Sequence, residues 1–226
     1  MICSCDFCDL KNLFYASLNS VDLEKFCSSR HEISLKTGQH LIRQNDEIKD
    51  FIYLKEGLVK LYRNSKQNQT QIISFGKPFD FVSLLSVFSD ERYNYSVTAL
   101  VDSVACVFDL NEIKKLIRSN GEFAMQLIQA QNRSSDRIII DSLNMLQKRL
   151  YGRVATVLLY FADEIYKDDA YELPISRKEL AQFIGMSIEN VIRAISAFRK
   201  DKIIQVYGKN FAIVDRNRLE QMRDFS

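Results

Sequence analysis

The 226-residue sequence has no apolar stretch long enough to cross a membrane. Its longest apolar-rich segment, residues 154–162, is far below the ~20 residues that a membrane-spanning helix needs. The N-terminus also lacks the basic region and apolar run of a secretory signal. We therefore expect a cytoplasmic protein with no membrane partner, whose five cysteines stay in a reducing compartment and form no disulfide framework.

The sequence also lacks the motifs of the common enzyme classes. It contains no P-loop and no GxGxxG, HExxH or GxSxG motif. Only two histidines are present, His31 and His40, and neither belongs to a recognisable catalytic constellation. General acid–base catalysis therefore lacks its usual agent, and we expect that the protein is not an enzyme. A transcription regulator and a small-molecule or redox-binding module are the two remaining hypotheses.

Charge is distributed unevenly, although the formal net charge is only +2. From Ser176 onward there are ten Lys/Arg and six Asp/Glu, a net charge of +4, so the preceding residues carry −2. A basic C-terminal part behind an acidic body fits a nucleic-acid partner. A solvated basic surface would give the same count, so charge alone does not decide between the two.

Residues 31–110 show short apolar or alternating runs that are typical of β-strands. Turn residues separate the runs, for example at 36–38, 45–46 and 56–57. Many short strands at this spacing predict a compact antiparallel β barrel or roll. The seven expected strands cover residues 32–35, 40–43, 51–54, 58–62, 71–75, 96–100 and 104–108.

The hydrophobic period then changes to that of helices. We expect short helices at residues 20–27 and 111–117, and a long helix at 123–150, which contains neither proline nor glycine. A long helix that follows a β domain is too exposed to stand alone, so we expect it to form a homodimer. Packing on its own β domain is the alternative. The apolar positions are Phe123, Leu127, Ile128, Ile138, Ile139, Leu143, Leu146 and Leu150.

A third region carries the most specific pattern of the chain. After a helix at 153–166 and an extended piece at 173–175, Ser176 and Glu179 are spaced as a capping box. Gly185 ends that helix in a left-handed turn, and Ser187 caps the next one. Two capped helices joined by a glycine-containing turn form a helix-turn-helix. Residues 203–206 and 211–214 then flank 207–210 as a β-hairpin, the wing.

The second helix of this motif divides into two faces. Val191, Ile195 and Phe198 follow the i, i+4, i+7 spacing of a core face. The opposite side, near the end that enters the major groove of DNA in such motifs, carries Ser187, Ile188, Glu189, Asn190 and Arg193.

The chemistry of this outward side suits the reading of bases. Arginine donates two hydrogen bonds to guanine, glutamate accepts one from cytosine N4, and isoleucine contacts a thymine methyl. We include Ser176 at the start of the motif and Lys209 at the wing tip, where it is placed for a phosphate. These residues predict a double-stranded DNA partner. The alternative for Glu189 and Arg193 is a surface i,i+4 ion pair.

On these residues the chain resembles the CRP/FNR family of bacterial regulators over nearly its full length. Residues 36–62 (KTGQHLIRQNDEIKDFIYLKEGLVKLY) resemble the start of the family's cyclic-nucleotide-binding β-roll. The long helix resembles its dimerisation helix, and residues 175–204 (ISRKELAQFIGMSIENVIRAISAFRKDKII) resemble its helix-turn-helix.

The resemblance implies an α+β fold with three parts. These are an N-terminal double-stranded β-roll as sensory domain (1–110), a long dimerisation-helix region (111–150) and a C-terminal winged helix-turn-helix that binds DNA (151–226). It also implies a homodimer that reads two half-sites of a near-palindrome about one helical turn apart, with RNA polymerase as a further partner.

The effector site departs from that of the cyclic-AMP-binding members. They hold the ribose and cyclic phosphate with a Gly-Glu and an Arg-Ser pair, and the corresponding residues here are Ser83-Leu84 and Tyr93-Asn94. Without that arginine, nothing evident neutralises a buried phosphate. We therefore expect a regulator whose effector pocket, at these four residues, takes an effector other than cyclic AMP.

Four cysteines suggest an alternative, an iron–sulfur or other redox-sensing regulator. Oxygen sensors of the FNR branch hold a cluster through three N-terminal cysteines and one in the β-roll, which would correspond to Cys3, Cys5, Cys8 and Cys106. The N-terminal spacing here is tighter than in the family, and Phe14 occupies the place of the third ligand. Zinc binding, vestigial N-terminal cysteines and a core role for Cys106 stay open. Haem is disfavoured, because His31 and His40 fit ordinary structural roles in expected strands.

Overall fold

The computed structural model describes residues 30–67 and 69–225. The expected helix at 20–27 lies outside these residues. The chain forms two compact units. One contains Ser74–Arg137 and the described residues before Asn64, and the other contains Asn64–Ile73 and the residues from Ile138 onward.

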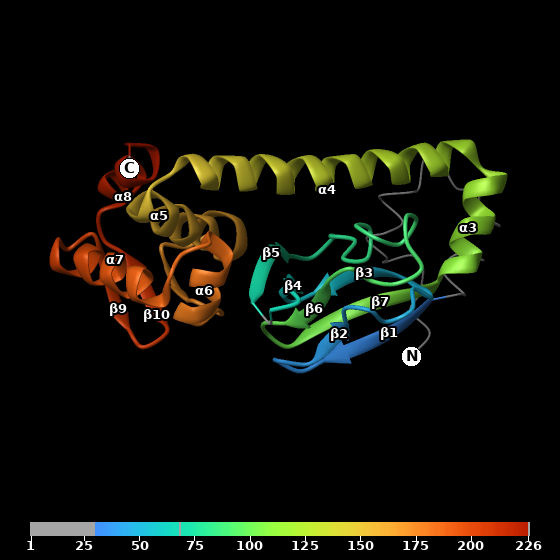
Figure 1. Cartoon of the computed structure of the whole chain (residues 1–226), viewed down its shortest axis with the longest axis horizontal. Coiled ribbons are helices and arrows are strands. Elements are labelled where there is room, and N and C mark those ends of the chain that lie inside the picture. The colour runs from blue at the N-terminus through green and yellow to red at the C-terminus, as the bar shows by residue number, and fades with distance from the viewer. Residues whose placement is uncertain (1–29, 68, 226) are drawn as a thin grey trace. The chain divides into compact units, whose positions relative to one another are not determined.

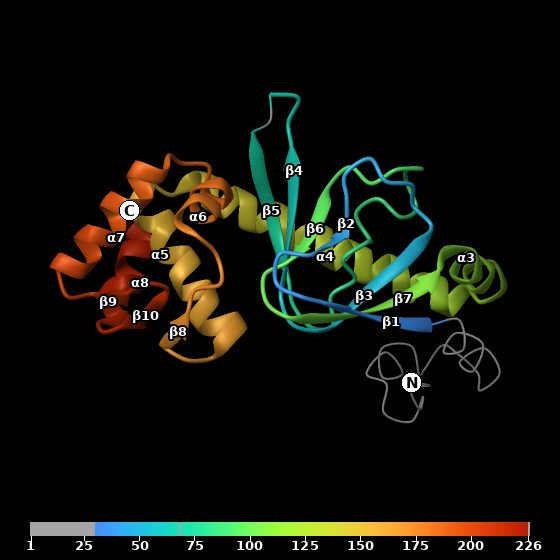
Figure 2. The same ribbon diagram turned by 90° about the horizontal axis from the view of Figure 1, so that it is seen from below.

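Two sheets form the β-roll, and all seven expected strands are present (Figures 1 and 2). One sheet has the order β1-β7-β3 and the other the order β2-β6-β4-β5. The strands are β1 (Arg30–Leu35), β2 (His40–Ile42), β3 (Asp50–Glu56), β4 (Val59–Asn64), β5 (Thr70–Gly76), β6 (Ser96–Ala99) and β7 (Ser103–Asp109).

The turn between β3 and β4 requires glycine. Gly57 has a φ of +94°, and a Cβ there would lie 2.2 Å from Ser103 Oγ. The same hydroxyl accepts a hydrogen bond from the Leu58 amide at 3.2 Å. The absence of a side chain at position 57 thus lets the two sheets approach each other at this corner.

The core of the β-roll extends into the helices that follow it. Asp109 caps α3 (Leu110–Ser119) by accepting from the amides of Asn111 and Glu112. α4 (Gly121–Gln147) begins directly afterwards, and its first turns bury Phe123 and Leu127. One apolar cluster joins the strands to both helices and consists of Phe51, Tyr53, Phe81, Leu84, Val87, Cys106, Phe108, Leu110, Ile113, Leu116, Phe123 and Leu127.

The long helix ends earlier than the sequence predicts. α4 stops at Gln147 instead of residue 150, and α5 (Leu150–Tyr160) begins before Gly152, which lies inside it. The guanidinium of Arg153 stabilises this break, because it donates to the carbonyls of Leu146 at 3.3 Å and Lys148 at 2.8 Å. It thereby satisfies acceptors that the end of a helix leaves unpaired. The helix expected at 153–166 is therefore α5 followed by a π-helical segment, η2 (Phe161–Tyr166).

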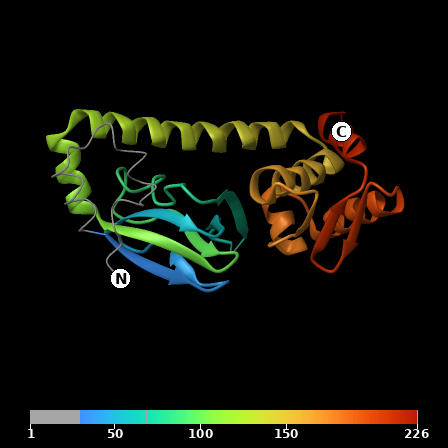
Figure 3. The same ribbon diagram turned by 180° about the vertical axis from the view of Figure 1, so that it is seen from behind.

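The C-terminal elements form a winged helix-turn-helix (Figures 1 and 3). Its helices are α6 (Arg177–Ile184), α7 (Ile188–Lys200) and α8 (Arg216–Phe225). Its small sheet has the order β8-β10-β9, with β8 (Ala170–Glu172), β9 (Ile204–Tyr207) and β10 (Asn210–Ile213).

Two details of this domain differ from the expectation. The extended piece predicted at 173–175 is a strand three residues earlier, because Pro174 has no amide hydrogen to continue the ladder with β10. The sequence analysis also did not foresee α8, whose residues are mostly polar. In the described part of the chain, no helix combines the length and apolarity that a membrane span requires.

Candidate nucleic-acid interface

The helix-turn-helix has the caps that its sequence predicts. The Ser176 hydroxyl accepts from the Glu179 amide at 3.2 Å, and the Glu179 carboxylate accepts from the Ser176 amide at 2.8 Å. α6 ends at Gly185, which has a φ of +66°. Ser187 then caps α7 by accepting from the Asn190 amide at 3.3 Å. These local bonds fix where α7 begins, and hence which side chains stand at its N-terminal end.

α7 has the two faces that the spacing predicts. Val191, Ala194, Ile195 and Phe198 are buried. Ser187, Ile188, Glu189 and Arg193 are exposed on the other side, and Asn190 is half-buried. The predicted core face is therefore confirmed, and the five predicted DNA-binding residues of this helix lie together at its outer N-terminal end.

Glu189 and Arg193 have separate hydrogen-bond partners. The Arg193 guanidinium donates to Asn190 Oδ1, one turn earlier on α7. The Glu189 carboxylate accepts from its own amide and from the Ser187 hydroxyl, which together hold its pKa below its usual value. Glu189 therefore stays an ionised acceptor and Arg193 a donor. This arrangement does not match the i,i+4 ion pair that the sequence left open.

The wing is attached to α6 through a residue that the sequence analysis missed. Gly208 and Lys209 connect β9 and β10, and Lys209 is exposed at this turn. The Arg177 guanidinium lies 4.6 Å from the centre of the Phe211 ring and donates to the Gly208 carbonyl at 3.1 Å. Burial lowers the pKa of Arg177. The only sequence signal for this contact is an arginine in the first turn of a capped helix.

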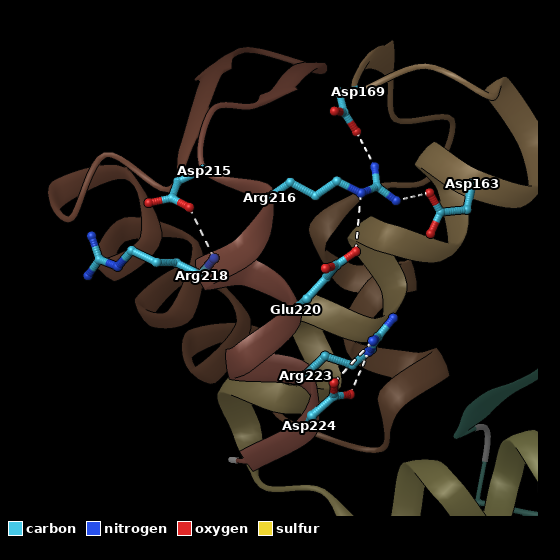
Figure 4. Close-up of polar contacts among 8 residues, drawn as sticks. All are labelled: Asp163, Asp169, Asp215, Arg216, Arg218, Glu220, Arg223 and Asp224. Carbon is cyan, nitrogen blue, oxygen red and sulfur yellow. Dashed lines mark hydrogen bonds and ion pairs between the residues drawn. The ribbon is translucent and has the colours of Figure 1, made fainter.

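A network around Arg216 holds α8 in place behind the helix-turn-helix (Figure 4). Its guanidinium contacts Asp163 of η2 and Asp169 in the turn before β8, and it donates to Glu220 at 3.2 Å. The carboxylates of Asp163 and Asp169 raise the pKa of Arg216, so the guanidinium stays charged. One cation therefore joins three elements of the winged domain.

The first turn of α8 also contacts α7 through Arg218. Asp215 accepts from the Arg218 amide at 3.0 Å and so caps α8. The Arg218 guanidinium donates to the Asp201 carbonyl at 3.1 Å, at the C-terminal end of α7. A cation at that end satisfies an open carbonyl and suits the negative end of the helix dipole. α8, which the sequence did not predict, thus stabilises α7.

The residues predicted to form the effector pocket take part in the packing of the β-roll. Ser83 is fully buried, and its hydroxyl accepts from the Ile52 amide at 2.9 Å. Leu84 belongs to the apolar cluster. Tyr93 is buried and donates to the Asp50 carbonyl at 3.1 Å. Only Asn94 is exposed.

A second tyrosine, Tyr95, which the sequence analysis did not consider, packs against the segment that contains Ser83. Tyr95 is buried and donates to the Val82 carbonyl at 2.9 Å, next to Ser83. Burial raises the pKa of both Tyr93 and Tyr95, so both hydroxyls stay protonated donors. Three of the four residues expected to form the effector pocket, Ser83, Leu84 and Tyr93, are therefore neutral side chains buried in the β-roll.

The proposed cysteine ligands are described only in part. Cys3, Cys5 and Cys8 lie outside the described residues. Cys106 lies on β7, is 1% exposed and belongs to the apolar cluster. The described residues therefore support a core role for the Cys106 side chain.

Comparison with known proteins covers both halves of the chain. Residues 32–120 match the cyclic nucleotide-binding domain, and residues 152–222 match the Crp-like helix-turn-helix domain. The chain is 24% identical to the transcriptional activator protein FnrA of Stutzerimonas stutzeri, over 93% of this chain and 88% of the relative. It is 21% identical to the fumarate and nitrate reduction regulatory protein of Escherichia coli, over 96% and 89%.

The solved structures confirm the fold. FixK2 from Bradyrhizobium japonicum superposes with a TM-score of 0.75 at 21% identity, and the match covers 87% of this chain and 98% of that one. The expected α+β architecture, with a β-roll, a long helix and a C-terminal helix-turn-helix, is thus confirmed. Because the matched domains and the relatives agree, the chain belongs to the CRP/FNR family of transcription regulators, which are DNA-binding proteins and not enzymes.

Proposed function

We propose that this regulator works as a homodimer that reads a near-palindromic DNA site through α7 and responds to an effector other than cyclic AMP. Residues 1–110 sense, residues 111–150 dimerise and residues 151–226 bind DNA. The observation that carries the proposal is the outer N-terminal end of α7. There Glu189 and Arg193 are exposed, oppositely charged and directed to separate partners.

The dimer is supported by an apolar stripe on α4. Six large apolar side chains of this helix are between 51% and 68% exposed: Met125, Ile128, Ile139, Ile140, Leu143 and Leu146. At about 100° per residue, all six fall within an arc of roughly 120°, on the side opposite the buried Phe123 and Leu127. A second copy of the same helix would cover such a stripe by coiled-coil-like packing.

The DNA contacts follow from the chemistry of the exposed residues. Arg193 takes O6 and N7 of a guanine, Glu189 accepts from the N4 of a nearby cytosine, and Ile188 contacts a thymine methyl. Ser176 and Lys209 lie at the start of α6 and at the wing tip, where the phosphate backbone passes in such complexes. The family resemblance adds a half-site of TTGA type, RNA polymerase as a further partner and a cytoplasmic location.

The effector proposal rests on the segment around Ser83 and Tyr93. Cyclic AMP needs a cation for its phosphate, and a neutral tyrosine stands where the family's arginine would lie. For the iron–sulfur alternative, the described residues include only Cys106, which packs in an apolar core. An anaerobically purified sample with stoichiometric iron and a visible absorption band would restore that alternative.

In-vitro selection on random DNA tests the proposed function. We expect an enriched motif with a two-fold repeat and a G·C pair in the middle of each half. Affinity for this motif should fall as salt rises, because phosphate contacts release counterions. A protein that enriches no motif, or one without two-fold symmetry, would contradict the proposal.

A further inference from the structure

The turn that follows β5 holds a phenylalanine in a backbone conformation that favours glycine. The Asp80 amide donates to the Lys77 carbonyl at 3.0 Å, and Phe79 has a φ of +77°. With Pro78 at its second position, this is a type II β-turn, whose third position requires a positive φ and is normally glycine or asparagine. The chain therefore places a bulky side chain where a Cβ is disfavoured.

Hydrogen bonds to β3 and within the turn fix this backbone. The Phe79 amide donates to the Leu54 carbonyl at 2.9 Å, and the Leu54 amide donates to the Asp80 carbonyl at 2.9 Å. The Asp80 carboxylate also accepts from the Lys77 amide at 3.0 Å. The positive φ of Phe79 is thus imposed by its surroundings, which is the condition under which such a conformation persists.

The core of the β-roll uses only part of the Phe79 side chain. The centre of its ring lies 6.3 Å from that of the buried Tyr53, yet Phe79 is 55% exposed. The exposed part gains nothing from burial in a single chain. A residue that breaks a local backbone preference without an evident gain for the fold is expected at a functional site. The exposed part of the ring therefore points to a partner that covers it.

A salt bridge places this turn beside α4. The Arg137 guanidinium donates to the Asp80 carboxylate at 3.2 Å. At about 100° per residue, Arg137 lies roughly 40° from the buried Phe123 and roughly 60° from the exposed Ile140 around the helix axis. The turn therefore lies along one edge of the exposed apolar stripe of α4. Packed helices have axes about 8–10 Å apart, so a helix that covers the stripe reaches side chains along its edge.

A second copy of the chain fits this position better than a charged ligand. Phe79 presents an apolar surface, and the stripe on α4 is apolar as well. The charge of Arg137 is already balanced by Asp80, so this pair does not offer a free cation to an anionic ligand. One apolar helix that packs on α4 removes the stripe and the Phe79 ring from water together.

We propose that Phe79 is a dimer-contact residue, whose ring packs against α4 of the partner copy. The two-fold symmetry of a homodimer gives one such contact from each copy. The inference rests on the proposed function, since it takes α4 as the dimer helix. The turn runs directly into Ser83 and Leu84, so the contact joins the segment proposed to bind the effector to the dimer interface.

The dissociation constant of the full-length dimer tests the proposal. Phe79→Gly removes the ring and keeps the turn. A phenylalanine side chain has about 200 Å² of surface, and cover of about a quarter of it contributes a factor of about ten. With two copies, the dimer Kd from sedimentation equilibrium should rise about a hundredfold. Phe79→Leu keeps an apolar side chain and should raise the Kd only severalfold.

Phe88 supplies a matched control. It is 39% exposed, and its ring centre lies 6.2 Å from that of the core residue Phe51, so it resembles Phe79 in both respects. The loop after it is tied by a hydrogen bond from Asn94 to Asp90 at 2.8 Å and not by a salt bridge to α4. Phe88→Ala should therefore leave the dimer Kd unchanged.

A monomeric background separates assembly from folding. Phe79→Gly is also made in the full chain that carries Ile139→Glu and Leu143→Glu, two charges in the apolar stripe that should abolish the dimer. In this background the denaturant midpoint should change little, because glycine relieves the positive φ and offsets the lost contact with Tyr53.

Each outcome decides one of the two proposals. A hundredfold rise of the dimer Kd in Phe79→Gly, with a steady midpoint in the monomeric background, would support the contact. An unchanged Kd in a wild type that dimerises through α4 would overturn the contact and leave the dimer helix intact. A fall of the midpoint large enough to account for the whole effect would also overturn it, since Phe79 would then serve the fold of one chain. A monomeric wild type would overturn both.

Discussion

The winged domain and the β-roll differ in whether the residues of their proposed sites are exposed or buried. In the winged domain, Glu189, Arg193 and Lys209 are exposed, and capped helices hold the first two in position. In the β-roll, three of the four residues proposed to correspond to the ligand contacts of cyclic-AMP-binding relatives are buried, with Leu84 in the apolar cluster and the Tyr93 hydroxyl on a backbone carbonyl. The proposed DNA-reading surface is thus exposed, while most of the proposed sensing segment is filled by the protein's own side chains.

The difference shows that one site depends on local sequence signals and the other on contacts between distant residues. Local signals such as a capping serine or a turn glycine fix the reading surface. Contacts between residues far apart in the chain fix the sensing segment, such as the Ile52 amide on the Ser83 hydroxyl. The two regions should therefore respond differently to substitution.

The largest effect is expected from a charge in the filled segment. Leu84→Glu places a carboxylate without a partner in the apolar cluster, which should lower the free energy of unfolding by on the order of 4 kcal/mol. Leu84→Met, which keeps the volume, is the control. Glu189→Gln, in the proposed reading surface, should lower the denaturant midpoint far less than Leu84→Glu and should alter DNA preference. Equal midpoints for Leu84→Glu and Glu189→Gln would show that the two regions do not differ in their tolerance of substitution.

The second largest effect is expected from substitutions that disrupt the proposed dimer. Replacing both Ile139 and Leu143 with glutamate should halve the mass seen by light scattering at micromolar concentration, from about twice 26.3 kDa to one chain. DNA affinity should fall by about a hundredfold or more, because two half-sites are no longer bound together. Asn144→Glu, exposed on another side of α4, should change neither quantity. A monomeric wild type with full DNA affinity would refute the dimer.

A smaller and more selective effect is expected at Arg193. Arg193→Ala should cost about 1–3 kcal/mol of binding free energy and relax the preference at the G·C pair. Competition binding between the selected site and its single-base variants measures the base preference of the variant protein. If the selected motif stays unchanged in the variant, then Arg193 does not read that base pair.

The wing should contribute affinity without sequence preference. Lys209→Ala should weaken binding to all sequences alike and reduce the slope of log K against log salt by about one unit. Band shifts at several salt concentrations with selected and random DNA give both slopes. A loss confined to the selected site would mean that Lys209 reads bases.

No effect at all is expected from cyclic AMP. Titration calorimetry of the protein with cyclic AMP should show no binding heat, because no cation stands at Tyr93 to hold the phosphate. Micromolar binding would show that the assignment of Ser83, Leu84, Tyr93 and Asn94 is wrong.

The sequence predicted the features that depend on neighbours along the chain. Ser176, Gly185 and Ser187 set the ends of α6 and α7, and alternation set the strands of the β-roll. It did not predict the end of α4 at Gln147, because the carbonyls there are satisfied by Arg153 from the next helix.

The other surprises have the same origin. α8 is mostly polar, and beside the buried Leu219 it is held by the contacts of Arg216. The inward placement of Tyr93 and Tyr95 depends on carbonyls at Asp50 and Val82, which no local pattern reveals. Features that rest on long-range polar contacts leave no periodic trace in the sequence.

The Arg153 side chain has a mechanical consequence. Besides Leu146 and Lys148 at the end of α4, its guanidinium bonds the Ile184 carbonyl at 2.8 Å, at the last residue of α6. One planar cation therefore ties the end of the long helix to the turn that precedes α7. A rotation of the end of α4 would therefore move that turn with it, because the hydrogen bonds of Arg153 connect the two.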